Sequence, residues 1–377
     1  MGVLVNTGFD PYARKIRYAV VGVGWISQAA FLPGVEHTEN SEVVALVTSD
    51  EFKAQKVGEL YGIKKTCTYA EYGELLASGE IDAVYLATPN VDHVELAVRT
   101  LEAGIHLLLE KPMAVSVAEC ERIIAASKKS GAKLMIAYRL HHEPGTLSAL
   151  EVVRSHKLGK VRFFNSSFSQ QVSGLNHRAK NGFWAGPVTD MGPYPLNAVR
   201  NLFGAEPIEV FATGVISDPQ RFDFEDTVSV TLKFEDARMA TFTVSYTGGD
   251  VDDYRVVGEL GDIFVQPAYQ VGSKIEYTTT IAKKKSHEGF PKTDHFGGEL
   301  KYFSDCIRYN REPEADGEEG MLDVRVFEAI ERSLRTGEVQ RLAPYYRSKR
   351  PIPSQVEELY AVSEPSLVHA SKPSDGR

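Results

Sequence analysis

The stretch Ala103-Gly-Ile-His-Leu-Leu-Leu-Glu-Lys-Pro-Met113 joins a short apolar run to an abrupt charged end. Residues 105–109 are apolar except for His106, as expected of a central strand in a parallel sheet covered on both faces. Glu110 and Lys111 follow without a spacer. Because ligands of open α/β sheets bind beyond the carboxyl ends of the strands, this pair is predicted to lie where a cofactor meets its substrate. A surface turn with a solvated Lys111 is an equal alternative from these residues alone.

A glycine turn follows the first expected strand. Residues 15–21, Lys-Ile-Arg-Tyr-Ala-Val-Val, predict a buried strand, and Gly22-Val-Gly24-Trp-Ile-Ser27 comes directly after it. This is a variant of the dinucleotide fingerprint: the first glycine permits a tight turn, and the second lets the backbone approach a pyrophosphate at a helix N-terminus. Glycines also end strands for structural reasons alone, but a strand before and a helix after favour dinucleotide binding.

Strands and helices alternate as far as residue 137, which predicts parallel strands joined by right-handed crossovers. Ser116 is expected to cap a helix in a capping box with Glu119, and Gly131 to end that helix. The expected strands are 43–47, 66–69, 82–88, 105–109 and 133–137, and the expected helices are 51–61, 71–77, 91–103 and 117–130.

The pattern changes after residue 138. About six strand-like runs between residues 208 and 281 are separated by turns, which predicts an antiparallel sheet. We therefore predict an α/β protein with a Rossmann-type doubly wound domain (1–138), an α+β domain with a large, mostly antiparallel open sheet (139–345), and a flexible or partner-wrapping tail (346–377). Expected helices in the second domain are 144–156, 190–203, 295–309 and 320–336, with a further strand at 161–170 and a polar loop at 171–187.

The composition limits the class of protein. A net charge of −9 over 377 residues argues against nucleic acid or an anionic membrane as the main partner. The three cysteines are far apart and lie in apolar patterns, which favours buried thiols in a reducing compartment over disulfides, and no metal site is expected. No export signal or membrane-spanning run is recognisable, so a cytoplasmic protein is expected.

Asp190 and Tyr194 are the candidate reactive residues of the second domain. They are four residues apart on the expected helix 190–203, so their side chains would share one face. Taken alone, Tyr194 can be a packed residue and Asp190 a helix N-cap. However, this segment follows a polar loop and is the candidate to face Lys111. A lysine ammonium beside a tyrosine phenol favours the phenolate, which makes the two a workable proton-transfer pair.

These motifs together resemble one family. The order Gly-x-Gly-x-x-small, Glu110-Lys-Pro112, Tyr138-Arg139 and Asp190-x-Gly-x-Tyr194-x-Leu-Asn197 is similar to the glucose-fructose oxidoreductase and inositol dehydrogenase family of nicotinamide enzymes (the Gfo/Idh/MocA type), over roughly residues 15–345. Tyrosine at 194, where many members carry histidine, looks like the branch with glucose-fructose oxidoreductase and NADP-dependent D-xylose 1-dehydrogenases. Two departures are a loop before Asp190 without the usual run of glycines and a short N-terminal arm.

The resemblance implies roles for particular residues. Lys111 and Tyr194 would act at the C1 hydroxyl of a sugar, Asp190 would position the substrate or Tyr194, and the bond before Pro112 would be cis. The residues expected to contact the cofactor are Gly22, Gly24, Trp25, Ile26, Thr48, Ser49, Lys53, Thr88, Pro89, Asn90, His93, Glu110, Lys111 and Arg139.

The residue ending the second strand is expected to choose between NAD and NADP. An acidic residue there binds the ribose hydroxyls of NAD and repels a 2′-phosphate. In register with the family, Thr48 takes this place, and Thr48, Ser49 and Lys53 suit a phosphate. The alternative is that Asp50 binds the ribose and selects NAD, although Asp50 is also placed to cap the helix that begins at Glu51. We favour NADP.

The sequence thus predicts an NADP-dependent aldose 1-dehydrogenase that forms a lactone. The alternatives are a glucose-fructose-type oxidoreductase that retains NADP, and a nicotinamide-binding redox sensor without turnover, which would be expected to lack the lysine or the tyrosine. A homodimer or homotetramer is also expected, because residues 240–246 place Phe242 and Val244 on one face of the open sheet and no later helical run looks long enough to cover it.

Overall fold

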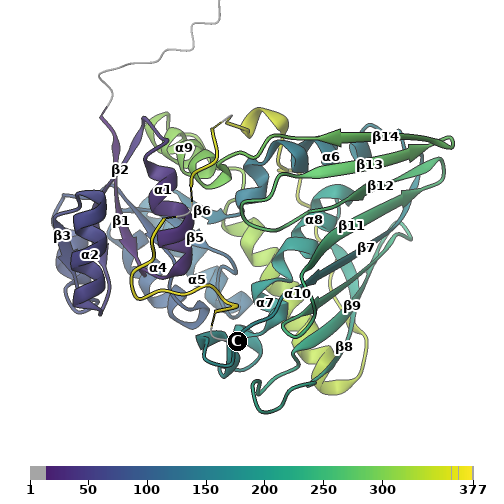
Figure 1. The fold of residues 1–377 in the computed structure, drawn as a ribbon, viewed down its shortest axis with the longest axis horizontal. Coiled ribbons are helices and arrows are strands. Elements are labelled where there is room, and N and C mark those ends of the chain that lie inside the picture. The colour runs from purple at the N-terminus through teal and green to yellow at the C-terminus, as the bar shows by residue number, and fades with distance from the viewer. Residues whose placement is uncertain (1–13, 358, 364, 376–377) are drawn as a thin grey trace, which may run out of the picture.

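The computed structural model describes residues 14–357, 359–363 and 365–375, and its first sheet has six parallel strands in the order β3-β2-β1-β4-β5-β6 (Figure 1). This order reverses between β1 and β4, which is the point where doubly wound sheets bind ligands. The strands are β1 (Ile16–Val21), β2 (Ser41–Val47), β3 (Lys65–Cys67), β4 (Ala83–Leu86), β5 (His106–Glu110) and β6 (Leu134–Ala137). The predicted short N-terminal arm lies almost wholly outside the described residues.

The helices of this half begin and end largely where the sequence predicted. Gly62 and Gly131 end α2 and α5 in the left-handed conformation that glycine favours. Ser116 caps α5 by accepting from the Glu119 N–H at 3.2 Å, but the Glu119 carboxylate accepts from Val115, so the capping box is half formed. The helices are α1 (Leu32–Val35), α2 (Glu51–Tyr61), α3 (Tyr72–Ala77), α4 (His93–Glu102) and α5 (Val117–Ser130).

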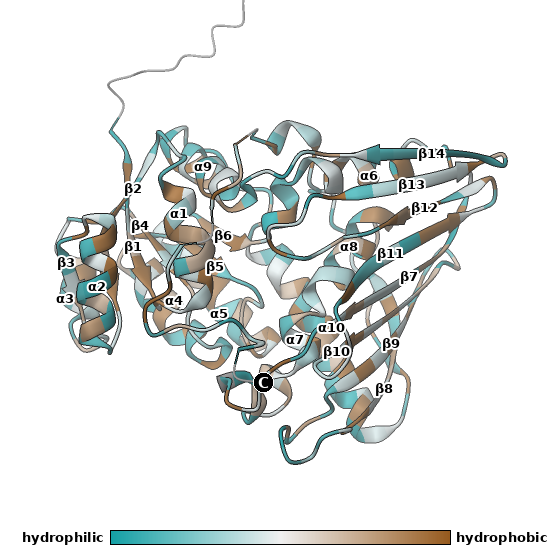
Figure 2. Ribbon diagram, in the orientation of Figure 1, coloured by the Kyte–Doolittle hydropathy of each residue, from teal (hydrophilic) through white to brown (hydrophobic). Residues whose placement is uncertain are grey.

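The second sheet has nine strands in the order β14-β13-β12-β11-β7-β10-β9-β8-β15. All neighbours are antiparallel except β7 and β10, which are parallel, so the predicted antiparallel sheet is confirmed apart from this one pair. The strands are β7 (Val161–Ser169), β8 (Pro207–Val215), β9 (Thr227–Phe234), β10 (Met239–Ser245), β11 (Val251–Gly258), β12 (Gly261–Val265), β13 (Glu276–Ile281), β14 (Lys284–Gly289) and β15 (Gln340–Arg341). Figure 2 shows that β14 is mostly hydrophilic, whereas β1 carries hydrophobic residues.

Helices cover the face of this sheet that is turned toward the first domain (Figure 1). Phe242 and Val244 are buried in the core on that side, so the prediction that their face of the sheet would be left open for an interface is wrong. The helix that begins at Gly317 is three residues longer than the sequence suggested, and it packs along β8. The helices after the parallel sheet are α6 (Pro144–Arg154), α7 (Pro187–Asp190), α8 (Pro193–Phe203), α9 (His295–Arg308) and α10 (Gly317–Thr336). Of these, α9 packs instead on α1, β1 and β2 of the first domain.

The predicted helix 190–203 is in fact two helices. Asp190 is the last residue of α7, and α8 starts only at Pro193. Gly192 marks the break, because a Cβ there would lie 2.1 Å from the carbonyl oxygen of Val188, and Pro193 has no N–H to continue the ladder. Asp190 therefore neither caps a helix nor shares a helical face with Tyr194.

A buried charge network joins α8 to α10. The guanidinium of Arg200, fully buried, donates to Glu206, Glu319 and Asp323. Tyr138, at the end of β6, donates to the same Asp323 at 2.7 Å. The network thus fixes the helices of the second domain to the end of the parallel sheet.

The C-terminal segment packs against both domains of the protein and does not extend as a free tail. Asp294 donates its N–H to the carbonyl of Leu359, and the side-chain amide of Gln28 bonds to both the N–H and the carbonyl of Val368, at 2.7 and 2.9 Å. Ser173 then donates to the carbonyl of Pro373. The yellow segment in Figure 1 crosses from the first domain toward the second. In the described part of the chain, no helix has the length and hydropathy required to span a bilayer.

Candidate active site

A cavity of about 1220 Å³ lies between the carboxyl ends of the parallel strands and the helices that cover the second sheet. It exceeds the roughly 300–1,000 Å³ of an ordinary ligand pocket, so there is room for more than one ligand. Of the residues singled out from the sequence, those lining it are Gly22, Gly24, Trp25, Ile26, Thr48, Ser49, Lys53, Thr88, Pro89, Asn90, Glu110, Lys111, Arg139, Asp190 and Tyr194.

The glycine turn after β1 forms one wall of the cavity. Gly22 has φ +89°, and a Cβ there would meet the carbonyl oxygen of Ala87 at 2.5 Å, so only glycine fits. At Gly24 a Cβ would meet nothing within 4 Å, which leaves the backbone open to the cavity. Ser27 donates to the carbonyl of Gly22 at 2.6 Å and so stands in for the third glycine of the fingerprint. The turn leads into a π-helical turn, Ser27–Phe31, and then α1.

Two polar atoms beside this turn are buried without a hydrogen-bond partner: Nε1 of Trp25 and Oγ1 of Thr88. Buried polar groups are nearly always satisfied, so unpaired ones that line a cavity indicate a polar ligand. A glycine cradle, an indole N–H and a threonine hydroxyl together fit the pyrophosphate and amide groups of a nicotinamide dinucleotide.

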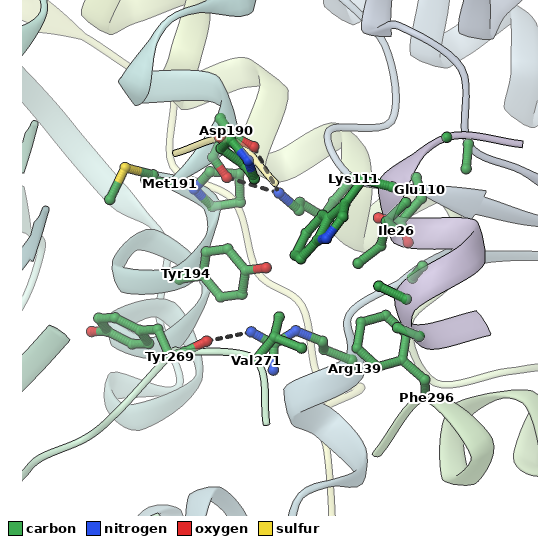
Figure 3. A pocket seen from close by; sticks show the side chains of 18 of the residues that line it. Ile26, Glu110, Lys111, Arg139, Asp190, Met191, Tyr194, Tyr269, Val271 and Phe296 are labelled. Carbon is green, nitrogen blue, oxygen red and sulfur yellow. Dashed lines mark hydrogen bonds and ion pairs between the residues drawn. The ribbon is translucent and has the colours of Figure 1, made fainter. Parts of the chain in front are cut away.

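Lys111 reaches across the cavity from the end of β5. The Lys111–Pro112 bond is cis, as the family resemblance implied. The Lys111 ammonium donates to the backbone carbonyl of Asp190 at 2.7 Å and lies 3.7 Å from its carboxylate (Figure 3). Its side chain is 15% exposed. The lysine is thus an anchored charge inside the cavity, which excludes the alternative of a solvated surface turn.

Tyr194 lies between two cations. The ammonium of Lys111 is 4.9 Å from the centre of the tyrosine ring, and the guanidinium of Arg139 is 5.0 Å from it. Figure 3 shows the hydroxyl of Tyr194 directed into the space between these two side chains. Arg139 is held in turn by the carbonyl of Tyr269 and by His295. Burial, followed by the charge of Arg139, lowers the pKa of His295 well below its ordinary value, so its neutral ring can accept this hydrogen bond.

The Asp190 carboxylate is fixed from two sides. Tyr246, on the chain just after β10, donates to it at 3.0 Å, and Arg178 lies 3.2 Å from it. Burial lowers the pKa of Arg178, but the charge of Asp190, the hydrogen bond to it and the nearby tyrosines together leave that pKa above its ordinary value. The Asp190 backbone, and with it Lys111, is therefore held by residues of the second domain.

Two carboxyl groups lie close to these cations, the half-buried Glu110 and the buried Glu299. Glu110 accepts from Tyr85 at 2.7 Å, and burial raises the pKa of Glu110 although Lys111 opposes this. Burial and then the charge of Glu110 raise the pKa of Glu299 well above its ordinary range, and Oε1 of Glu299 has no hydrogen-bond partner. Both groups favour the protonated form more than a solvated glutamic acid does.

The far end of the cavity lies at the end of β2. Thr48 is buried, and Ser49 and Lys53 line the same wall. Asp50 caps α2 as the sequence suggested, because its carboxylate accepts from the Lys53 N–H at 2.9 Å. The hydrogen bonds from Lys53 and His369 lower the pKa of Asp50.

His93 is not brought to the cavity. It is fully buried, and its two ring nitrogens lie 3.0 Å from the carbonyls of Pro112 and Thr88. The ring therefore joins the loop after β4 to the loop after β5 instead of facing a ligand. In the described part of the chain, no cluster of three or more His, Cys, Asp or Glu residues could hold a metal ion.

Sequence reasoning missed several residues of the cavity wall. Arg178 and Trp184 come from the polar loop 171–187, and the Trp184 carbonyl accepts from the Asn90 amide at 2.7 Å, which joins the two domains. The polarity of that loop was the only hint in the sequence. Residues 361–363, 365, 367 and 369–374 also line the cavity, and nothing in their pattern predicted it.

Comparisons with known proteins agree with this geometry. The family described as "Oxidoreductase family, NAD-binding Rossmann fold" matches residues 16–138, and the GFO/IDH/MocA C-terminal domain matches residues 146–264. The D-xylose 1-dehydrogenase (NADP(+)) of Haloarcula marismortui is 30% identical over 343 residues, which are 87% of this chain and 94% of the relative. A D-xylose 1-dehydrogenase (NADP(+)) of Haloferax volcanii is 29% identical over 85% of this chain and 98% of the relative.

Solved structures show the same architecture. The aldose-aldose oxidoreductase from Caulobacter crescentus, complexed with glycerol, has a TM-score of 0.81 and 33% identity, over 87% of this chain and 100% of that one. A 3-ketoreductase from Actinomadura kijaniata in complex with NADP has a TM-score of 0.75 at 22% identity, over 85% of this chain and 98% of that one, which shows the fold alone. The fold, the glycine turn and these matches over most of the chain establish that the protein belongs to the GFO/IDH/MocA family of oxidoreductases.

Proposed function

We propose that this protein is an NADP-dependent dehydrogenase that oxidises the anomeric carbon of an aldose to a lactone. The observation that carries the proposal is the placement of Lys111 and Tyr194 in the same cavity as the glycine turn, with the ammonium 4.9 Å from the ring centre. The two D-xylose 1-dehydrogenases at about 30% identity, both named for NADP, support the substrate class and the cofactor.

Two groups of residues in the cavity would bind different parts of the cofactor. The turn at Gly22 and Gly24 would hold the pyrophosphate, and Thr48, Ser49 and Lys53 would face the 2′-phosphate. NADP supplies the acceptor for the hydride that leaves C1 of the sugar.

Tyr194 acts at the C1 hydroxyl. As the C1–H bond breaks and the carbonyl forms, the phenolate oxygen of Tyr194 takes the hydroxyl proton. The ammonium of Lys111 stabilises the negative charge on that oxygen before the proton arrives. The hydrogen bond from Lys111 to the carbonyl of Asp190 holds the ammonium in place, and Arg139 bounds the other side of the ring.

The test is a spectrophotometric screen of D-xylose, D-glucose and other aldoses with NADP and with NAD. Each sugar is paired with its 1,5-anhydro analogue, which has no C1 hydroxyl, and the lactone is trapped with hydroxylamine. We expect reduction of NADP with one or more aldoses and none with the anhydro sugars. Turnover of an anhydro sugar would place the oxidation at another carbon.

A second candidate is an oxidoreductase that keeps NADP bound while it oxidises one sugar and reduces another. The likeness to an aldose-aldose oxidoreductase at 33% identity favours it. This candidate predicts that extensively dialysed protein interconverts two sugars without added cofactor. An exchanging dehydrogenase would stop until NADP is restored.

A further inference from the structure

The C-terminal segment forms a third wall of the cavity that would hold the dinucleotide. Residues 369–374 line this cavity together with the glycine turn. The segment is fixed on both sides, because Gln28, 2% exposed, bonds both backbone groups of Val368, and Ser173 donates to the carbonyl of Pro373. The position of His369 between these anchors is therefore a defined part of the fold.

His369 lies against the residues at the end of β2. Its Nδ1 is 2.9 Å from a carboxylate oxygen of Asp50, and its ring stacks on that of Phe52 with the centres 4.7 Å apart. The other carboxylate oxygen of Asp50 accepts from the Lys53 N–H. Both oxygens of Asp50 are thus engaged by this chain's own donors.

This placement matters because a carboxylate at the end of the second strand selects NAD. Such a group accepts hydrogen bonds from the ribose hydroxyls and repels a 2′-phosphate. Asp50 is two residues beyond Thr48, and its hydrogen-bond partner His369 lines the cavity together with Thr48, Ser49 and Lys53. A donor that occupies its outer oxygen removes an acceptor from the ribose and reduces the repulsion of a phosphate.

We propose that His369 is a specificity-determining residue of the cofactor site: by holding the Asp50 carboxylate, it prevents Asp50 from selecting NAD and favours NADP. This role rests on the proposed NADP-dependent function. The segment that carries His369 therefore does more than cover the cavity, since it sets which dinucleotide the first domain binds.

The experiment measures dissociation constants for NADPH and NADH by fluorescence titration, without any sugar. The variants are His369→Ala, Asp50→Asn and the double variant, with His287→Ala on the exposed strand β14 as the matched control. We expect His369→Ala to lower the preference for NADPH over NADH by about three- to tenfold, the size of one charge-assisted hydrogen bond at a half-exposed site. Adding Asp50→Asn should restore most of the preference, and His287→Ala should not change it.

Each other outcome overturns the proposal in a different way. If His369→Ala leaves the preference for NADPH over NADH unchanged, the contact between His369 and Asp50 does not affect cofactor choice. An equal loss of affinity for both dinucleotides would mean that the segment only covers the cavity. A loss that persists in the double variant would mean that His369 contacts the ligand without acting through Asp50. If the parent protein binds neither dinucleotide, the proposed function itself fails.

Discussion

The Lys111 ammonium donates a hydrogen bond of 2.7 Å to the backbone carbonyl of Asp190, and this contact joins the end of β5 to the end of α7. A backbone acceptor holds the charge without neutralising it. The carboxylate of the same residue, 3.7 Å away, is drawn to Arg178 and Tyr246. The second domain therefore orients the lysine so that its ammonium lies 4.9 Å from the centre of the Tyr194 ring.

We expect Tyr194→Phe and Lys111→Ala each to lower kcat by about two orders of magnitude or more, because each removes part of a positioned proton transfer. Steady-state kinetics with the best aldose would measure this, and fluorescence titration should show nearly unchanged NADPH binding. Tyr309→Phe, on an exposed tyrosine, is the control. Near-normal turnover in Tyr194→Phe would remove the tyrosine from its proposed role.

Cofactor preference should also respond at the end of β2. Thr48→Asp places a carboxylate against the 2′-phosphate, and Lys53→Ala removes a positive charge from the same wall. We expect the ratio of kcat/KM for NADP to that for NAD to fall about tenfold or more in the first variant and less in the second. Lys56→Ala, on the same helix and paired with Glu59, should leave the ratio as it is. A parent enzyme that prefers NAD would contradict the assignment of Thr48.

Glu299 should make stability depend on pH. An acid whose folded-state pKa lies above its unfolded value binds its proton more tightly when folded, so its contribution to stability declines as pH rises from the unfolded value toward the folded one. Glu299→Gln removes this ionisation at a fully buried site. We expect the variant to gain about 1–3 kcal/mol relative to the parent at pH 7.5 and less at pH 5. Thermal unfolding at both pH values would measure it, and an equal change at both would argue against titration.

Arg200 should be essential to the stability of the second domain. Its removal leaves Glu206, Glu319 and Asp323 buried without their shared cation. We expect Arg200→Met to cost about 3–5 kcal/mol in urea unfolding. The exposed pair of Arg162 and Glu259 is the comparison, and Arg162→Met should cost less than about 1 kcal/mol. Equal effects of the two variants would show that the buried network adds nothing.

The expected homo-oligomer remains a prediction, but the exposed apolar residues that would form its interface lie on the other face of the sheet. Phe242 and Val244 pack on helices, whereas Phe163, Phe211 and Met239 are 38–44% exposed. Exposed apolar side chains on an open sheet indicate an interface. We expect Phe163→Glu to shift a dimer or tetramer toward monomers in light scattering, and Leu60→Glu, on α2, to leave it intact. A monomeric parent at micromolar concentration would contradict the prediction.

What the sequence predicted well depends on local signals. Gly62 and Gly131 end their helices because glycine adopts the left-handed conformation readily. The apolar run before Glu110 forms a buried strand, as a continuous apolar pattern predicts. The position of Lys111 was predicted because the ends of parallel strands meet at one edge of a sheet, whereas the roles of Asp190 and Tyr194 were implied by the family resemblance.

What the sequence did not predict depends on contacts between distant residues. Two of the three partners of Arg200, Glu319 and Asp323, come from another helix about 120 residues away. The break at Gly192 is the local exception, because Pro193 interrupts the hydrogen-bond ladder there. The covered position of Phe242 and the path of the C-terminal segment likewise require the assembled fold. Apolar alternation shows that a face is buried without showing what buries it.

The path of the C-terminal segment has a practical consequence for handling the protein. Ser374 still lines the cavity, so an affinity tag or fluorescent protein fused after residue 377 would begin three residues from the cavity wall. Such a fusion would add bulk and charge beside the very groups whose ligand preference is to be measured. Preparations intended for cofactor titrations should therefore be purified through the other end of the chain, or with the added sequence removed.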